Sequence, residues 1–94
     1  MFRVTEHRTA DRLVLKLEGR LSQEIAGELE ASWRAALAGA GGRTVWADLT
    51  DVLLGDAAAC EQLAGMHRAG VRFVSRGCLM REVVREITRS GDTR

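Results

Sequence analysis

The sequence predicts an α/β fold, a four-stranded mixed sheet with its helices mainly on one face. Apolar residues alternate with polar ones in two neighbouring N-terminal segments, which is typical of paired strands. Helical spacing then separates the later strands, and parallel neighbours need such crossovers. The expected order is β-β-α-β-α-β-α. Right-handed crossovers place successive helices on the same face of a sheet ordered 1-2-3-4.

The first two strands are expected at residues 2–7 and 12–18. In the second, Leu13, Leu15 and Leu17 share one face and polar or smaller residues share the other. Residues 9–11 have the composition of a hairpin turn, so the two strands should pair antiparallel. Gly19 is expected to end the second strand.

An amphipathic helix should follow, with Ser22 as its N-cap. Four apolar residues recur at four-residue spacing, which is typical of one buried helix face: Ile25, Leu29, Trp33 and Leu37. The glycine-rich stretch 39–42 ends this helix.

A central strand is expected at residues 43–49 and a loop at 50–55. Asp56 stands where the N-cap of a second helix should be, and Gly70 stands at its C′ position. A short strand at 71–75 and a last helix opening at Gly77 complete the order.

Length and charge limit the classes of function. The 94 residues suit one domain spanning residues 1–94, and the net charge of +1 does not favour nucleic acid as a partner. No apolar run approaches the ~20 residues that span a bilayer, so no membrane insertion is expected. The N-terminal residues lack a secretory pattern, and two cysteines, Cys60 and Cys78, fit a reducing compartment. A cytoplasmic location is therefore expected.

Four stretches, in the right order and spacing, make the chain similar to a STAS domain, the module shared by sulfate transporters and anti-sigma-factor antagonists. The segment 48–52 resembles the family's hydrophobic-Asp-Leu-Ser-x-Val, and 56–59 stands where many members have Asp-Ser-Ser-Gly. The segment 70–73 resembles the last strand, and 15–21 resembles the second strand with its Gly-x-Leu exit. The resemblance covers nearly the whole chain.

The resemblance implies a non-enzymatic module of bacterial signalling that binds a protein partner, an anti-sigma factor or related kinase-like protein. The implied docking residues lie in the 50–55 loop and the first turns of the second helix: Thr50, Asp51, Gly55, Asp56, Ala57, Ala58 and Glu61. Antagonists carry a phosphorylated serine in this turn. Here Ala57 and Ala58 occupy the aligned positions, and alanine cannot take a phosphate.

Two alternatives remain open at this point. Standalone STAS subunits also serve lipid or anion transport systems as cytoplasmic accessory parts, and some members bind nucleotides or lipids. Catalysis is not expected, because no serine or histidine lies in a recognisable nucleophile motif.

Neither a cofactor nor a metal is expected. The acidic residues Asp48, Asp51 and Asp56 could be interpreted as a Mg²⁺ site, but loop and capping roles are favoured for aspartates. Cys60 and His67 share a helix face and Cys78 could approach them, but no zinc-ligand spacing is present. Both cysteines are interpreted as small buried residues.

Trp46 suggests a second surface. In its strand, Thr44, Trp46 and Asp48 should share the face opposite the helices, next to Val14 and Val74 of neighbouring strands. A tryptophan among aliphatic side chains often marks a contact surface. We expect this face to mediate self-association as a homodimer or partner docking, unless the N-terminal hairpin or a bulge covers it.

Overall fold

The computed structural model describes residues 2–75 of the chain. These residues form four strands and two helices: β1 (Phe2–Arg8), β2 (Arg12–Leu21), α1 (Gln23–Ala38), β3 (Thr44–Leu54), α2 (Ala57–Arg68) and β4 (Arg72–Val74). The predicted last helix, opening at Gly77, and Cys78 lie outside the described residues.

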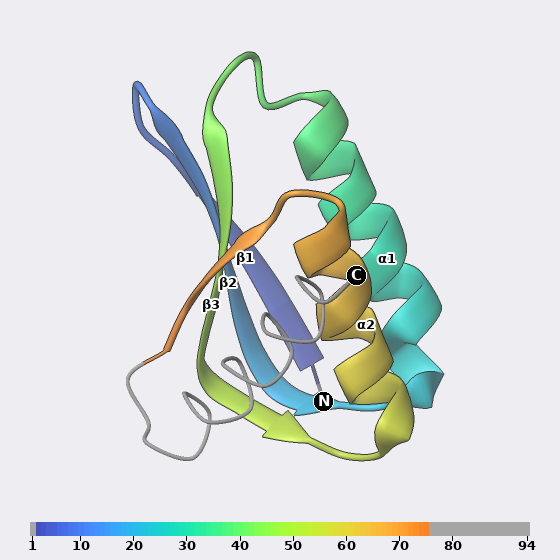
Figure 1. The fold of residues 1–94 in the computed structure, drawn as a ribbon. Coiled ribbons are helices and arrows are strands. Elements are labelled where there is room, and N and C mark those ends of the chain that lie inside the picture. Colours follow the sequence, from blue (N-terminus) through green and yellow to red (C-terminus); the bar gives the residue numbers. More distant parts are fainter. Residues whose placement is uncertain (1, 76–94) are drawn as a thin grey trace.

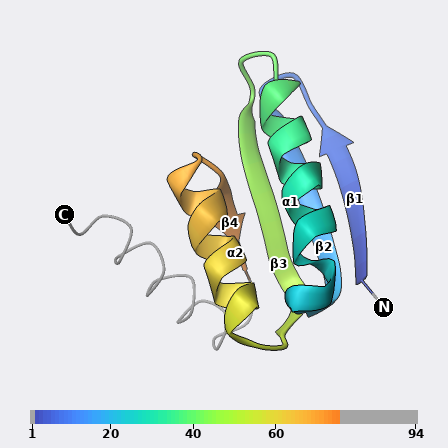
Figure 2. The same ribbon diagram turned by 90° about the vertical axis from the view of Figure 1, so that its right-hand side faces the viewer.

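The strands form one mixed sheet in the order β1-β2-β3-β4. β1 runs antiparallel to β2, while β2–β3 and β3–β4 are parallel pairs. Both helices lie on the same face of this sheet, as the edge-on view in Figure 1 and the turned view in Figure 2 show. The predicted mixed sheet, its strand order and the one-sided placement of these two helices are confirmed.

The core lies between the helices and the sheet. The three leucines that alternate along β2 are buried, as are Val45, Ala47 and Leu49 of β3. The helices contribute Leu29 and Trp33 from α1 and Ala59, Leu63 and Met66 from α2. The indole Nε1 of Trp33 donates a hydrogen bond of 3.0 Å to Oε1 of Gln62, which links the two helices within this layer.

Two predicted strand ends are wrong. β2 continues through Gly19 to Leu21, and Gly19 adopts a φ of 114° within the strand. β3 continues to Leu54, so the predicted loop at 50–55 is mostly strand. The reason is mutual pairing: Gly19 pairs with Val52, and Leu21 pairs with Leu54. The sequence of β2 or β3 alone does not predict its extension, because the extension depends on pairing with the other strand.

A β-bulge separates the two halves of the β2–β3 ladder. Lys16 faces Asp48 and Glu18 faces Asp51, so β3 takes three steps where β2 takes two. An extra residue of this kind bends a strand and re-aims the side chains beyond it. Val52 and Leu54 thereby point toward the core, although their positions in the sequence are even and those of Val45, Ala47 and Leu49 are odd.

The ends of the second helix match the prediction. Asp56 is the N-cap of α2, and the helix ends at Arg68, with Gly70 at a φ of 105° just beyond the C-cap. Within residues 2–75, no helix is both long enough and apolar enough to cross a membrane.

Candidate functional site

The end of β3 and the start of α2 meet at the lower end of the molecule in Figure 1, beside the end of β2 and the start of α1. The predicted docking residues all lie on these two adjoining elements or on the link between them, Gly55 and Asp56. We call the surface formed by Leu53, Gly55, Ala57, Ala58 and Glu61 the β3–α2 surface.

The bulge fixes the backbone that leads into this surface. Oδ1 of Asp48 accepts a hydrogen bond of 3.0 Å from the backbone N–H of Thr50. The Thr50 hydroxyl is itself buried and has no hydrogen-bond partner among the described residues. The Thr50 hydroxyl is therefore not accessible to a docking partner.

Leu53 is the feature that the sequence interpretation missed. Its side chain is 70% exposed, the only large hydrophobic side chain so exposed among residues 2–75. It pairs across the sheet with the exposed Arg20 of β2, whereas its neighbour Val52 is buried. In a strand, Leu53 must point to the opposite face from Val52 and Leu54, which would have predicted its exposure. Because the sequence predicts a loop here, this alternation could not be used.

Gly55 occupies a position that only glycine fits. Its N–H donates to the carbonyl oxygen of Leu21 at 2.7 Å, which closes the β2–β3 ladder. A Cβ at Gly55 would lie 2.7 Å from Nε of Arg20 and 2.9 Å from the carbonyl oxygen of Leu21. Because Leu21 O is a backbone atom, this contact cannot be relieved by rotating a side chain.

Asp56 joins the starts of both helices. Its Oδ1 accepts from the N–H of Ala58 at 3.1 Å, which is the predicted cap of α2. Its Oδ2 accepts from the N–H of Gln23 at 3.2 Å, the first residue of α1. Ser22 occupies the N-cap position of α1, as predicted, but its side chain makes no capping hydrogen bond. One carboxylate therefore serves two helix N-termini, where negative charge is favourable.

The first turns of α2 complete the surface with small side chains. Ala57 and Glu61 are exposed and Ala58 is half-buried. Cys60 is exposed as well, so its interpretation as a buried residue is wrong. It lies on the outer side of the helix, whereas Ala59 next to it points inward and is fully buried. No hydroxyl-bearing residue lies in α2.

The three aspartates have separate structural contacts. Asp48 binds the Thr50 N–H, Asp56 binds the two helix starts, and Asp51 forms an ion pair of 3.4 Å with Lys16. These are the loop and capping roles favoured for Asp48 and Asp56. Within residues 2–75, no three His, Cys, Asp or Glu residues cluster as a metal site would require.

Trp46 points away from the helices, on the opposite face of the sheet from the core. It is half-buried and pairs across the sheet with Val14, while Val74 lies one row along, opposite Asp48. Its Nε1 donates to Oγ1 of Thr44 at 3.0 Å. The predicted face of Trp46 is confirmed, whereas the role of that face stays a prediction.

No family model matches the chain, and no curated protein matches it. Solved structures do. A crystal structure of an anti-sigma factor antagonist from Mycobacterium paratuberculosis superposes with a TM-score of 0.71 at 22% identity, covering 97% of this chain and 79% of that one. An uncharacterized protein of the DUF3478 family with a SpoIIAA-like fold, from Shewanella loihica, gives a TM-score of 0.62 at 19% identity, covering 95% and 79%.

At these identities the likeness concerns the fold. Its coverage extends over nearly the whole chain. The fold of this chain is therefore that of the anti-sigma factor antagonists and SpoIIAA-like proteins, a STAS-like fold.

Proposed function

We propose that this chain is a non-enzymatic interaction module of bacterial signalling, and that it docks onto a protein partner through the β3–α2 surface. The observation that carries the proposal is the exposure of Leu53 beside the start of α2. An exposed leucine gives a partner an apolar contact, and burying such a side chain contributes about 1.5–3 kcal/mol.

The partner class that the fold supports best is an anti-sigma factor or a related kinase-like protein. One structural neighbour is itself an anti-sigma factor antagonist, and the STAS resemblance assigns partner docking to this end of the fold. The neighbour's role is transferred here as a proposal only.

By the STAS resemblance, the lack of a hydroxyl side chain in α2 separates this module from the antagonists that are phosphorylated in this turn. Ala57 and Ala58 occupy the positions of their serine, and α2 contains no hydroxyl side chain from Ala57 to Arg68. Docking at the β3–α2 surface would then be constitutive, or regulated at another site, because no phosphate charge of about −1.5 to −2 can be added at this turn.

The test is a pull-down from a lysate of the source bacterium with variants that spare the fold. Asp56 is unsuitable for substitution because it holds both helix starts. Leu53→Glu and Ala57→Glu change exposed side chains of the surface, and Ala35→Glu, at an exposed position of α1, is the matched control. Circular dichroism confirms that each variant is folded.

We expect one protein to be recovered by the wild type and by Ala35→Glu, and lost with both Leu53→Glu and Ala57→Glu. Its affinity for the purified chain should fall at least tenfold with Leu53→Glu. A kinase-like protein recovered in this way supports the signalling role. A transport ATPase subunit supports the accessory role in lipid or anion transport instead. Equal recovery by all four baits would contradict docking at this surface.

A further inference from the structure

Two arginines converge on Trp46 from the strands on either side of β3. Cζ of Arg12, from β2, lies 4.7 Å from the ring centroid of Trp46, and Cζ of Arg72, from β4, lies 5.7 Å away. Arg72 pairs directly with Trp46 across the sheet. We call these three residues the arginine–tryptophan cluster. It lies on the sheet face that carries no helix among the described residues.

Neither guanidinium of the cluster has a hydrogen-bond or ion-pair acceptor among the residues that the structure describes. The ion pairs among residues 2–75 are Glu6–Arg8, Lys16–Asp51 and Glu30–Arg34. The side-chain hydrogen bonds of the same residues include none donated by the guanidinium of Arg12 or Arg72. Both arginines are exposed.

The helix layer also contains an arginine over a tryptophan ring, and there the arginine has a carboxylate partner. Cζ of Arg34 lies 4.6 Å from the ring centroid of Trp33, and Nε of Arg34 donates to Oε2 of Glu30 at 2.8 Å. A guanidinium stacked on a ring keeps its N–H groups in its own plane, where they can bind a carboxylate. The arginine–tryptophan cluster has two guanidiniums near one ring, and neither pairs with a carboxylate of residues 2–75.

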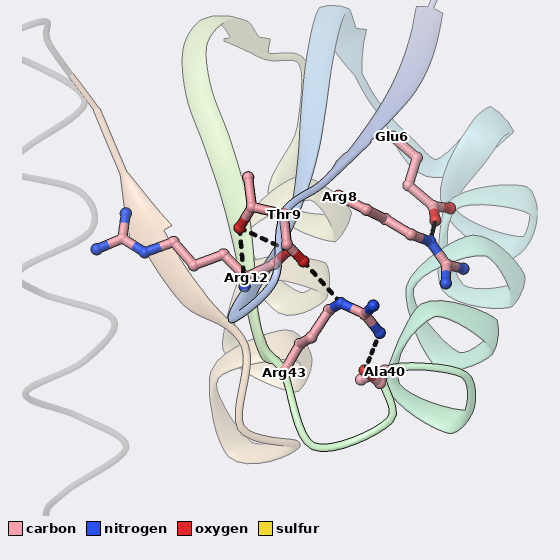
Figure 3. A network of polar contacts seen from close by, with 6 residues as sticks. All are labelled: Glu6, Arg8, Thr9, Arg12, Ala40 and Arg43. Atoms are coloured by element: carbon pink, nitrogen blue, oxygen red, sulfur yellow. Dashed lines mark hydrogen bonds and ion pairs between the residues drawn. The ribbon is translucent and has the colours of Figure 1, made fainter.

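Three hydrogen bonds order the backbone at Arg12 and at the adjoining Thr9. Its N–H donates to Oγ1 of Thr9 at 3.1 Å, and its carbonyl accepts from the N–H of Thr9 at 2.9 Å. Nε of Arg43 then binds the carbonyl of Thr9 at 2.8 Å. Figure 3 shows this network, with the Arg12 side chain extending away from it toward β4. The backbone of Arg12 is therefore already ordered before a partner binds, which lowers the entropy cost of binding.

We propose that the arginine–tryptophan cluster binds an acidic, extended segment of a partner protein, each guanidinium taking one carboxylate. Both Cζ atoms lie near one ring, at 4.7 and 5.7 Å from its centroid, so the two guanidiniums are close together. In an extended chain, side chains two residues apart share a face and stand about 6.6 Å apart, so the two carboxylates should stand two residues apart. This site lies on the opposite face of the sheet from the helix layer and does not depend on the β3–α2 surface.

The surroundings favour a protein segment over nucleic acid. The half-buried Val14 and Val74 flank the cluster on the same face and offer apolar contact to a peptide side chain. Tryptophan and arginine are also the residues most enriched at protein-binding hot spots.

A second copy of the chain fits less well. Two copies joined by a two-fold axis at the cluster itself would bring Arg12 and Arg72 of one copy against the same cations of the other. That arrangement would add repulsion and supply no carboxylate at the cluster.

The test uses fluorescein-labelled twelve-residue peptides and the whole chain. In a Val/Thr/Ser background, two glutamates stand one to five positions apart across the series, and fluorescence polarisation gives each Kd. We expect the tightest binding at a separation of two, which puts both glutamates on one face of the extended peptide. Arg12→Gln and Arg72→Gln should each raise the Kd of that peptide at least tenfold. Arg34→Gln, which removes the stacked arginine of Trp33, is the matched control and should leave the Kd within about twofold.

Three results would overturn the proposal. One is binding that ignores glutamate spacing and survives both cluster substitutions. Another is tighter binding of a twelve-nucleotide oligo-dT, lost with the same substitutions, which would make the cluster a nucleic-acid site. The third is a concentration-dependent dimer in sedimentation that Arg12→Gln abolishes, which would make it a self-association face. Leu53→Glu should leave peptide binding unchanged, so failure at the β3–α2 surface and failure here are distinguishable.

Discussion

At the scale of single residues, Asp56 has the largest structural role of the candidate site. The sequence assigns one helix start to Ser22 and the other to Asp56, since both are preferred capping residues. In the structure the Asp56 carboxylate accepts from both Ala58 and Gln23, and the Ser22 side chain caps nothing. A residue 33 positions later in the chain has replaced the local cap.

The two capping residues should therefore differ in their effect on stability. We expect Asp56→Ala to lower the free energy of unfolding by about 1–2 kcal/mol, the range of a lost N-cap, and Ser22→Ala to lower it by less than about 0.5 kcal/mol. Urea denaturation of the two variants and the wild type measures both values. Equal losses would contradict the double role of Asp56.

Gly55 offers a test of close backbone approach. Gly55→Ala places a Cβ against the carbonyl of Leu21, so we expect a loss of about 1–3 kcal/mol from overpacking. The matched control is Gly27→Ala in α1, where a Cβ would meet nothing within 4 Å. There we expect a gain of about 0.5–1 kcal/mol, because alanine favours a helix interior over glycine. Thermal unfolding gives both, and a tolerated Gly55→Ala would refute the steric argument.

Thr50 and Thr44 of β3 should respond in opposite directions to the same substitution. The Thr50 hydroxyl is buried without a hydrogen-bond partner, so Thr50→Val should raise the free energy of unfolding by up to about 1 kcal/mol. Oγ1 of Thr44 accepts from Trp46 and donates to the carbonyl of Asp11, so Thr44→Val should lower it by about 1 kcal/mol. Chemical denaturation of both variants measures the two free energies of unfolding. A lower free energy of unfolding for Thr50→Val than for the wild type would contradict the expectation.

At the scale of elements, the contact between α1 and α2 contains a titratable group. The hydrogen bond from Arg34 lowers the pKa of Glu30 below its ordinary value, and a hydrogen bond from Gln62 of α2 lowers it further. A carboxyl whose pKa is lowered on folding stabilises the fold above its unfolded pKa. That contribution is lost as the pH falls through the folded pKa.

Removal of Arg34 should therefore change the pKa of Glu30. We expect Arg34→Gln to raise the pKa of Glu30 toward its ordinary value and to reduce the loss of stability in acid. A ¹³C NMR titration of the Glu30 carboxyl measures the shift. Arg8→Gln, which removes the exposed partner of Glu6 on β1, should leave the Glu30 titration unchanged. An unshifted Glu30 in Arg34→Gln would show that the ion pair does not set its pKa.

The β2–β3 pair shows how elements differ from their separate sequences. The sequence predicts that each strand stops early, β2 at Gly19 and β3 at Leu49. The bulge lets them continue together, with Gly55 N–H bound to Leu21 O at the end of the ladder. The exposure of Leu53 follows from that shared extension, and with it the proposed docking surface.

At the scale of the whole molecule, the sheet divides the two tryptophans. Trp33 is 2% exposed in the helix layer, and Trp46 is half-buried on the opposite face. With only two tryptophans in the chain, their fluorescence reports the two sides separately. We expect acrylamide to quench Trp46 in Trp33→Phe much more strongly than Trp33 in Trp46→Phe. Equal quenching constants would contradict this layering.

This division gives the two proposed surfaces separate positions. The β3–α2 surface lies at one end of the sheet, where β3 leads into α2, and the arginine–tryptophan cluster lies on the sheet face away from the helices. A module of this shape can bind one partner at each.

By itself, the sequence determined the order of strands and helices within residues 2–75 and the buried faces of β2 and of α1. Period-two alternation in 12–18 and four-residue spacing from Ile25 to Leu37 reflect local chain geometry, and so does the Asp56 cap of α2. Tertiary structure decided the rest. The extension of β3, the second bond of Asp56, and the meeting of Arg12 and Arg72 over Trp46 join residues that are distant in the chain. No local pattern encodes such contacts, because strand register and packing alone bring those atoms together.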